Sequence, residues 1–348
     1  MHNHRIVIAS RPEGQPKPTD FRLEAAEVPP LKGGQVLLRV LFLSLDPYMR
    51  GRMSAAKSYA EPMAIGDVMV GGTVARVEES RNTAFSAGDI VISYSGWQEI
   101  AVSDGTDLRK IDPSQAPIST YLGVLGMPGM TAYTGLLNIG QPKAGETVVV
   151  AAATGPVGSA VGQIAKIKGA RAVGIAGGPE KCRALLEEFG FDAAVDHRSP
   201  RFADDLAKAC PSGVDVYFEN VGGEVWSAVL PLLNDFARVP VCGLVAHYND
   251  TELPAGPDRT PELMGRILRQ RLTLRGFLVF DFADQEPAFL ADMATWVREG
   301  RVKYREDVVQ GLAAAPEAFI GLLRGKNFGK LLVQVAAGHE LESPIEGG

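Results

Sequence analysis

A glycine-rich turn contains the residues of this sequence whose types and spacing are best suited to chemistry. Residues 152–162 read AATGPVGSAVG and follow a continuous apolar run. Against the pattern G-x-G-x-x-G, Ala153 takes the first position, and Gly155 and Gly158 take the other two. The middle glycine lets the backbone approach a pyrophosphate, and the third lets the helix that Pro156 opens pack closely on its strand. We interpret the turn as a dinucleotide site; the alternative is a tight turn that binds no ligand.

The loop after the next apolar run predicts which dinucleotide is bound. A site for NAD usually carries Asp or Glu about 20 residues past the glycines, to hold the ribose hydroxyls. Residues 174–181 read GIAGGPEK, with no acid at the strand end. Two glycines leave room for a 2′-phosphate, and Lys181 and Arg183 supply positive charge, so NADP(H) is favoured. The alternatives are that Lys181 is a solvated lysine at a helix start and that Glu180 points inward.

Zinc ligands are missing from the places where a zinc alcohol dehydrogenase needs them. The first cysteine is Cys182, and no histidine lies between His4 and His197. We therefore expect no metal and no alcohol oxidation through zinc polarisation. The cysteines, with Cys210 and Cys242, are odd in number and far apart, which indicates reduced thiols in a cytoplasmic protein. Metalloprotease, hydrolase and P-loop motifs are also missing.

The composition argues against several other classes of protein. With 348 residues, the chain is too long for one ordinary core, and its 46% hydrophobic content argues against a disordered protein. The net charge is −6 and no long basic run occurs, so we expect no nucleic-acid partner. No stretch is apolar enough for a membrane helix or a signal peptide, so we expect a cytoplasmic protein that does not bind membranes.

The elements that must position these residues change in character near residue 123. Beyond it, short apolar runs alternate with helical patterns, which is typical of a doubly wound parallel sheet. The expected strands are Thr147–Ala153, Arg171–Ala176, Ala193–Asp196, Val214–Glu219, Ala237–Cys242 and Leu272–Phe277. Two of the helical patterns are Pro156–Gly169 and Glu180–Phe189.

The remaining residues read as mainly β structure. Turn residues separate the expected strands Val36–Val40, Gly72–Val77 and Gly88–Tyr94. We therefore expect an α/β chain in which a Rossmann domain, 125–305, is inserted into a mainly β domain made of residues 1–124 and 306–348. The last residues, 338–348, are expected to form a loose tail.

Taken together, these segments resemble the medium-chain dehydrogenase/reductase superfamily. Within it, the chain resembles the zinc-independent branch of leukotriene, prostaglandin and alkenal double-bond reductases. The resemblance runs over nearly the whole chain. Besides the glycine turn, it is carried by LDPYMR (45–50), GMPGMTAY (126–133), AGGPEKC (176–182), ENVGG (219–223), VCGL (241–244) and GKNFGK (325–330). It implies a GroES-like fold for the β-rich domain, a homodimer built by sheet extension, and NADPH-dependent reduction of the C=C bond of an α,β-unsaturated ketone or aldehyde.

The resemblance also implies which residues contact NADP(H). Lys181 would hold the 2′-phosphate, Asn220 would lie near the nicotinamide, and His197 would lie near the adenine, where animal relatives have a tyrosine. The full set is Thr131, Gly155, Pro156, Val157, Gly158, Gly178, Lys181, His197, Asn220, Cys242, Gly243, Leu244, Tyr248, Phe277, Leu278, Val279 and Asn327.

Reduction of such an enone needs a hydride at the β-carbon, a donor for the carbonyl oxygen and a proton at the α-carbon. As the resemblance implies, Tyr248 is the first candidate for the donor or acid, because a tyrosine hydroxyl is neutral at pH 7. Tyr48 is the second. The alternatives are that Tyr248 is only a pocket wall, that Tyr48 is a core residue, and that a ribose hydroxyl or water supplies the proton. Arg50 and Arg52 either orient a carboxylate-bearing substrate or are surface and ion-pair residues.

Three other functions remain compatible with these motifs. The nearest is an NADPH-dependent quinone oxidoreductase, and the next is an alcohol or ketone dehydrogenase. The third is a non-catalytic NADPH-binding protein. The full set of cofactor segments, with two candidate acids, favours the enone reductase.

Overall fold

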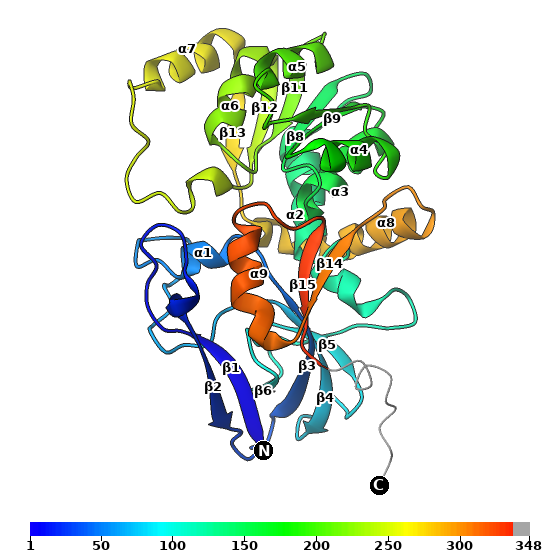
Figure 1. Cartoon of the computed structure of the whole chain (residues 1–348). Coiled ribbons are helices and arrows are strands. Elements are labelled where there is room, and N and C mark those ends of the chain that lie inside the picture. The colour runs from blue at the N-terminus through cyan, green and yellow to red at the C-terminus, as the bar shows by residue number, and fades with distance from the viewer. Residues whose placement is uncertain (337–348) are drawn as a thin grey trace. The chain divides into compact units, whose positions relative to one another are not determined.

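The computed structural model describes residues 1–336, and the tail expected at 338–348 lies outside the described residues (Figure 1). The chain divides into two compact units. Of the described residues, the first unit contains Met1–Leu122, Glu306–Asn327 and 331–336, and the second contains Gly123–Arg305 and Phe328–Lys330.

A six-stranded sheet forms the centre of the second unit, with strand order β10-β9-β8-β11-β12-β13 and parallel pairing throughout. The strands are β8 (Thr147–Ala151), β9 (Arg171–Ala176), β10 (Ala193–Asp196), β11 (Val214–Phe218), β12 (Leu233–Val241) and β13 (Thr273–Gly276). The predicted doubly wound parallel sheet is thereby confirmed. Strand β12 begins four residues before its predicted start. Its first residues are less apolar than the rest of the strand, and the pairing of β11 with β12 shifts register there, with Phe236 at φ 62°.

Helices cover both faces of this sheet, which explains why its strands are continuous apolar runs. On one face, α5, α6 and α7 contribute Leu206, Val229 and Ile267 to a core with the strands. On the other face, a Cβ atom added to Gly174 of β9 would lie 2.7 Å from Leu185 of α4. The helices of this unit are α2 (Met127–Thr134), α3 (Pro156–Ile167), α4 (Pro179–Glu187), α5 (Phe202–Ala209), α6 (Gly223–Val229), α7 (Thr260–Gln270) and α8 (Glu286–Arg298).

The first unit is mainly β. Its larger sheet has the order β14-β15-β3-β4-β5-β7, with β6 also paired to β3, and β1 pairs with β2 separately. The strands are β1 (His2–Ile8), β2 (Phe21–Glu27), β3 (Val36–Ser44), β4 (Thr73–Ser80), β5 (Ile90–Ser93), β6 (Ile100–Ser103), β7 (Arg109–Lys110), β14 (Glu306–Gln310) and β15 (Lys330–Gln334). Two helices, α1 (Met49–Arg52) and α9 (Ala315–Leu322), accompany them. Trp97 anchors the core, stacked on Phe21 and edge-on to Phe319.

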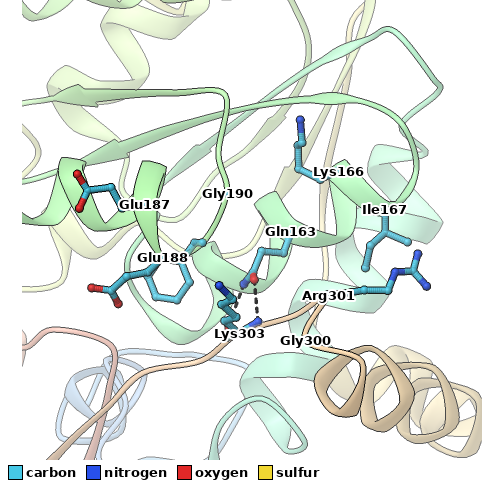
Figure 2. A pocket seen from close by; sticks show the side chains of 10 residues that line it. Gln163, Lys166, Ile167, Glu187, Glu188, Gly190, Gly300, Arg301 and Lys303 are labelled. Carbon is cyan, nitrogen blue, oxygen red and sulfur yellow. Dashed lines mark hydrogen bonds between the residues drawn. The ribbon is translucent and has the colours of Figure 1, made fainter.

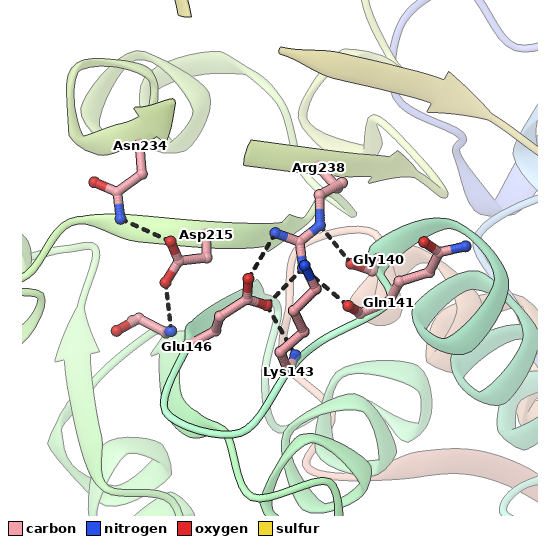
Figure 3. A network of polar contacts seen from close by, with 8 residues as sticks. Gly140, Gln141, Lys143, Glu146, Asp215, Asn234 and Arg238 are labelled. Atoms are coloured by element: carbon pink, nitrogen blue, oxygen red, sulfur yellow. Dashed lines mark hydrogen bonds and ion pairs between the residues drawn. The ribbon is translucent and has the colours of Figure 1, made fainter. Parts of the chain in front are cut away.

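A polar network fixes the chain segment that leads into β8 (Figure 3). Arg238 of β12 pairs with Glu146 at 2.5 Å and donates to the carbonyl oxygens of Gly140 and Gln141, both at 2.9 Å. The two charged side chains are only 18% and 19% exposed. Burial alone would raise the pKa of Glu146, but the hydrogen bonds from Arg238 and from the N–H of Lys143, together with the charges of these two residues, outweigh it and the pKa is lowered.

We expect Arg238→Met to lower the free energy of unfolding by about 2 kcal/mol, because it leaves the largely buried Glu146 carboxylate without its partner. Chemical denaturation would measure this. As a matched control, Arg301→Met removes an exposed pair with Glu299 and should change stability by less than about 0.5 kcal/mol. Since the pKa of Glu146 is lowered by folding, the stability from this pair is present at neutral pH and is lost as the pH falls through the lowered pKa. Equal effects of the two variants would contradict the assignment.

Candidate active site

The glycine turn joins β8 to α3 with the two backbones in close contact. A Cβ atom on Gly158 would lie 2.5 Å from the carbonyl oxygen of Ala152 and 2.7 Å from the Cα atom of Ala153, so no larger residue fits there. A Cβ atom on Gly155 would lie 3.3 Å from the same oxygen. Ala152 itself has φ 52°, in the left-handed region that residues other than glycine seldom adopt. The turn is therefore shaped by its residues to bring the helix start against the strand end.

The first turn of α3 presents backbone donors at this place. Pro156 has no N–H, and the first intrahelical bond is made by the N–H of Ser159 to the carbonyl oxygen of Gly155, at 2.9 Å. The N–H groups of Val157 and Gly158 precede that bond, and no side chain caps this end of the helix. Two donors and the positive end of a 12-residue helix make this a place that favours a phosphate group.

The loop after β9 is held by an acid from the neighbouring strand. Asp196 of β10 accepts hydrogen bonds from the N–H groups of Gly178 and Arg198, at 2.8 and 2.9 Å. Burial opposes ionisation, but these bonds and the nearby positive charge together outweigh it, and the pKa of Asp196 is lowered. Sequence reasoning missed this residue, since only the pairing of β10 with β9 brings it to the loop. One oxygen of the carboxylate is thus engaged by the protein backbone.

Three nitrogen-bearing side chains gather at the end of β9. A Cβ atom on Gly177 would lie 2.9 Å from Nε2 of His197 and 3.0 Å from Nε of Arg198. Burial lowers the pKa of His197, and the charges of Arg198 and Lys181 lower it further. The predicted residues Gly178, Lys181 and His197 are thus near one another. Arg198 was not predicted, although a second basic residue directly after His197 was a signal for it.

A buried glutamate organises the end of β11. The Oε1 atom of Glu219 accepts hydrogen bonds from the hydroxyl of Tyr217 at 2.9 Å and from the N–H groups of Val221 and Gly222, at 2.7 and 2.9 Å. Burial raises the pKa of Glu219. The side-chain amide of Asn220 donates to the carbonyl oxygen of Ala151, at 2.8 Å, and so ties this turn to the end of β8. Sequence reasoning named Asn220 but missed the role of Glu219.

The segment after β12 follows the same turn. The N–H groups of Cys242 and Gly243 donate to the carbonyl oxygen of Glu219, and that of Val245 donates to the carbonyl oxygen of Asn220. A Cβ atom on Gly243 would lie 3.0 Å from the hydroxyl of Tyr248. The structure therefore brings Asn220, Gly243 and Tyr248 together at the carboxyl ends of β11 and β12, while burial raises the pKa of the Cys242 thiol to about 12.

The side chains of two other predicted residues, Phe277 and Thr131, make contacts within the protein. The ring of Phe277 lies edge-on to Phe218, and the hydroxyl of Thr131 donates to the carbonyl oxygen of Met127 at 2.7 Å. Of the neighbouring predicted residues, Leu244 and Leu278 are the exposed hydrophobic side chains, while Val279 begins a short 3₁₀ segment. A cofactor contact at Phe277 would accordingly come from its backbone.

Two predicted residues belong to the first unit. Tyr48 is half-buried directly before α1, where burial and the nearby Asp46 raise the pKa of its hydroxyl well above the usual value. Its hydroxyl is therefore neutral at physiological pH. Asn327 lies in the segment between α9 and β15 and takes part in further interactions there.

A hollow of about 430 Å³ on the second unit is separate from these residues (Figure 2). Charged side chains line much of it, among them Lys166, Glu187 and Arg301. The buried Gln163 of α3 donates to the carbonyl oxygen of Lys303 and accepts from its N–H, at 2.9 and 2.7 Å. None of the described residues that line the hollow is a predicted site residue. The hydrogen bonds of Gln163 attach the backbone of Lys303 to α3.

Within residues 1–336, no group of three or more His, Cys, Asp and Glu side chains is arranged to hold a metal ion. Each helix that the structure describes is too short or too polar to cross a membrane.

Comparison with protein-family models gives two matches. Residues 4–111 match the N-terminal domain of oxidoreductase, and residues 156–295 match a family described as zinc-binding dehydrogenase. The second match begins at Pro156, the first residue of α3, and covers the ends of β9, β10, β11 and β12 described above.

Similar proteins cover nearly the whole chain. It is 58% identical to NADPH-dependent curcumin reductase of Escherichia coli, over 97% of this chain and 98% of that protein. It is 45% identical to rat prostaglandin reductase 1, over 92% and 96%. The crystal structure of CurA from Vibrio vulnificus in complex with NADPH is 54% identical and has a TM-score of 0.93, over 96% and 99%. The chain belongs to the medium-chain dehydrogenase/reductase superfamily, in the group that includes the curcumin and prostaglandin reductases.

Proposed function

We propose that this protein binds NADPH and reduces the carbon–carbon double bond of α,β-unsaturated ketones and aldehydes. The observation that carries the proposal is the convergence of a helix start with free N–H groups, two cationic side chains and a tyrosine hydroxyl at the carboxyl ends of β8, β9, β11 and β12. The names of three relatives support it: a curcumin reductase, a prostaglandin reductase and a tobacco 2-alkenal reductase that is 39% identical.

The residues at these strand ends fit the parts of NADPH. The pyrophosphate would accept hydrogen bonds from the N–H groups of Val157 and Gly158, and the 2′-phosphate would lie between Lys181 and Arg198. Asn220 and the backbone from Cys242 onward would lie beside the nicotinamide. These assignments follow from the site geometry, and NADPH binding is supported by the similar protein CurA of Vibrio vulnificus, whose crystal structure is a complex with NADPH.

The protein's part in the chemistry is to stabilise charge and supply a proton. Bound NADPH supplies a hydride, which leaves negative charge on the oxygen of the reduced enone. We assign the stabilising hydrogen bond and proton transfer to the hydroxyl of Tyr248, held over Gly243. Tyr48, whose raised pKa keeps it protonated, is the second candidate.

The coenzyme preference tests the 2′-phosphate assignment. We expect Lys181→Ala and Arg198→Ala each to lower the affinity for NADPH by about tenfold, because each removes one charge-assisted hydrogen bond, and to leave NADH binding nearly unchanged. Fluorescence titration with both coenzymes measures this. Lys208→Ala, on the exposed part of α5, is the matched control. An equal loss for the two coenzymes in either variant would refute its contact with the 2′-phosphate.

The proposed reaction is tested by following NADPH oxidation with alkenals, alkenones, curcumin-like dienones and a quinone, with identification of the product. We expect reduction of the C=C bond, which persists after treatment with a chelator because no zinc takes part. Tyr248→Phe should lower kcat by about tenfold or more while NADPH affinity is retained. Tyr133→Phe, which removes a hydroxyl bonded to Asp292 at 2.8 Å, is the control. An unchanged kcat would remove Tyr248 from the mechanism.

We also propose that the protein is a cytoplasmic homodimer. Strand β13 is at the edge of the six-stranded sheet, so it can pair with the same strand of a second copy. On α7, Met264 and Leu268 lie on one helix face and are 58% and 78% exposed. Exposed apolar side chains beside an edge strand support association through this part of the second unit.

Sedimentation tests the dimer. At micromolar concentration we expect twice the chain mass of 37.1 kDa for the wild type and a shift toward the monomer for Leu268→Asp, because a buried charge at the interface opposes association. Leu186→Asp, at an exposed leucine of α4, should leave the mass unchanged. A monomeric wild type would contradict the proposal.

A further inference from the structure

Two of three arginines around α1 are used to hold the chain in place. Arg11 donates to the carbonyl oxygens of Met53 and Met63, at 3.1 and 2.7 Å. The guanidinium of Arg50 is buried and donates to the carbonyl oxygen of Gly14 at 2.8 Å. These two side chains therefore have structural roles.

Arg52, the last residue of α1, differs from both. Its Nε atom is inaccessible to solvent and meets no hydrogen-bond acceptor among the described residues. Within residues 1–336, no carboxylate lies within ion-pair distance of its guanidinium, as the ion pairs of the first unit use other arginines and lysines. The guanidinium of Arg52 therefore has hydrogen-bonding capacity that the described protein does not use.

The charge of Arg52 interacts with two tyrosines, and the nearby Asp46, which acts on Tyr48, accepts a hydrogen bond from the hydroxyl of Ser44. The guanidinium charge acts on the hydroxyls of Tyr48 and Tyr59, where it opposes the rise in pKa that burial causes. Because both phenols remain protonated, neither neutralises the guanidinium. Tyr59 is 57% exposed, so this group reaches the surface of the first unit.

The loop that carries Tyr59 is fixed at both ends. The N–H of Met63 donates to the carbonyl oxygen of Arg52, at 3.2 Å, and Arg11 holds both Met53 and Met63. Met53 and Met63 are themselves buried. Residues 53–63 therefore hold Tyr59 near the guanidinium, while Tyr48 lies directly before the helix that Arg52 ends.

We propose that Arg52, with Tyr48 and Tyr59, forms a subsite for a carboxylate carried by an aromatic substrate. A guanidinium can bind both oxygens of a carboxylate, and the two rings offer contact area for an aryl group. One cation matches the single charge of a carboxylate better than the double charge of a phosphate monoester. The inference rests on the proposed enone reduction, and it specifies which enones are preferred.

The test compares ring-carboxylated benzalacetones, meta and para, with their methyl esters. For the wild type we expect kcat/KM to be about tenfold higher for at least one acid than for its ester, owing to a charge-assisted pair. Arg52→Met should abolish this preference, and Arg52→Lys should retain part of it. Lys57→Met removes a positive charge from the same loop and should leave the preference intact, which controls for long-range electrostatics.

A binding measurement separates this inference from the proposed function. Calorimetry with the saturated acids and their esters, which undergo no reduction, should show preferential binding of the acid by the wild type and its loss in Arg52→Met. If no enone is reduced but the acid preference in binding remains, the proposed function fails and the subsite stands. If the esters are reduced and neither measurement favours an acid, or if Arg52→Met keeps the preference, the subsite is refuted.

Discussion

The structure of the site depends on how closely α3 approaches the end of β8. At Gly158 the helix lies so near the carbonyl oxygen of Ala152 that a Cβ atom would be only 2.5 Å away. This contact sets where the free N–H groups of the first helical turn point, and so where a phosphate can be held. Asn220 joins the same strand end through the carbonyl oxygen of Ala151, so the neighbouring turn is positioned relative to it.

Two acids then determine how the neighbouring loops leave the sheet. Asp196 receives the backbone N–H of Gly178 and that of Arg198, and Glu219 receives those of Val221 and Gly222. Because these carboxylates bind backbone, they act by positioning other residues. The first holds the cation-bearing loops around β9, and the second supports the turn on which the segment leading to Tyr248 is built.

Local patterns in the sequence predicted a parallel sheet, the glycine turn and the succession of strands and helices along the chain, since each depends on residues that are neighbours in the sequence. Arg198, Asp196 and Glu219 depend instead on which strands are adjacent in space, so their roles were missed. Likewise, Arg50 and Arg52 are equivalent as sequence neighbours, and only the tertiary contacts show that the first binds backbone carbonyls while the second does not. The start of β12 differs from its predicted position because a register shift between strands leaves no signal in the hydrophobic periodicity of the sequence.

The most direct test of the account is a crystal structure of this protein with NADPH. We predict that pyrophosphate oxygens accept hydrogen bonds from the N–H groups of Val157 and Gly158, with the 2′-phosphate near Lys181 and Arg198. Electron density for the dinucleotide at another place, with only solvent at the start of α3, would contradict it.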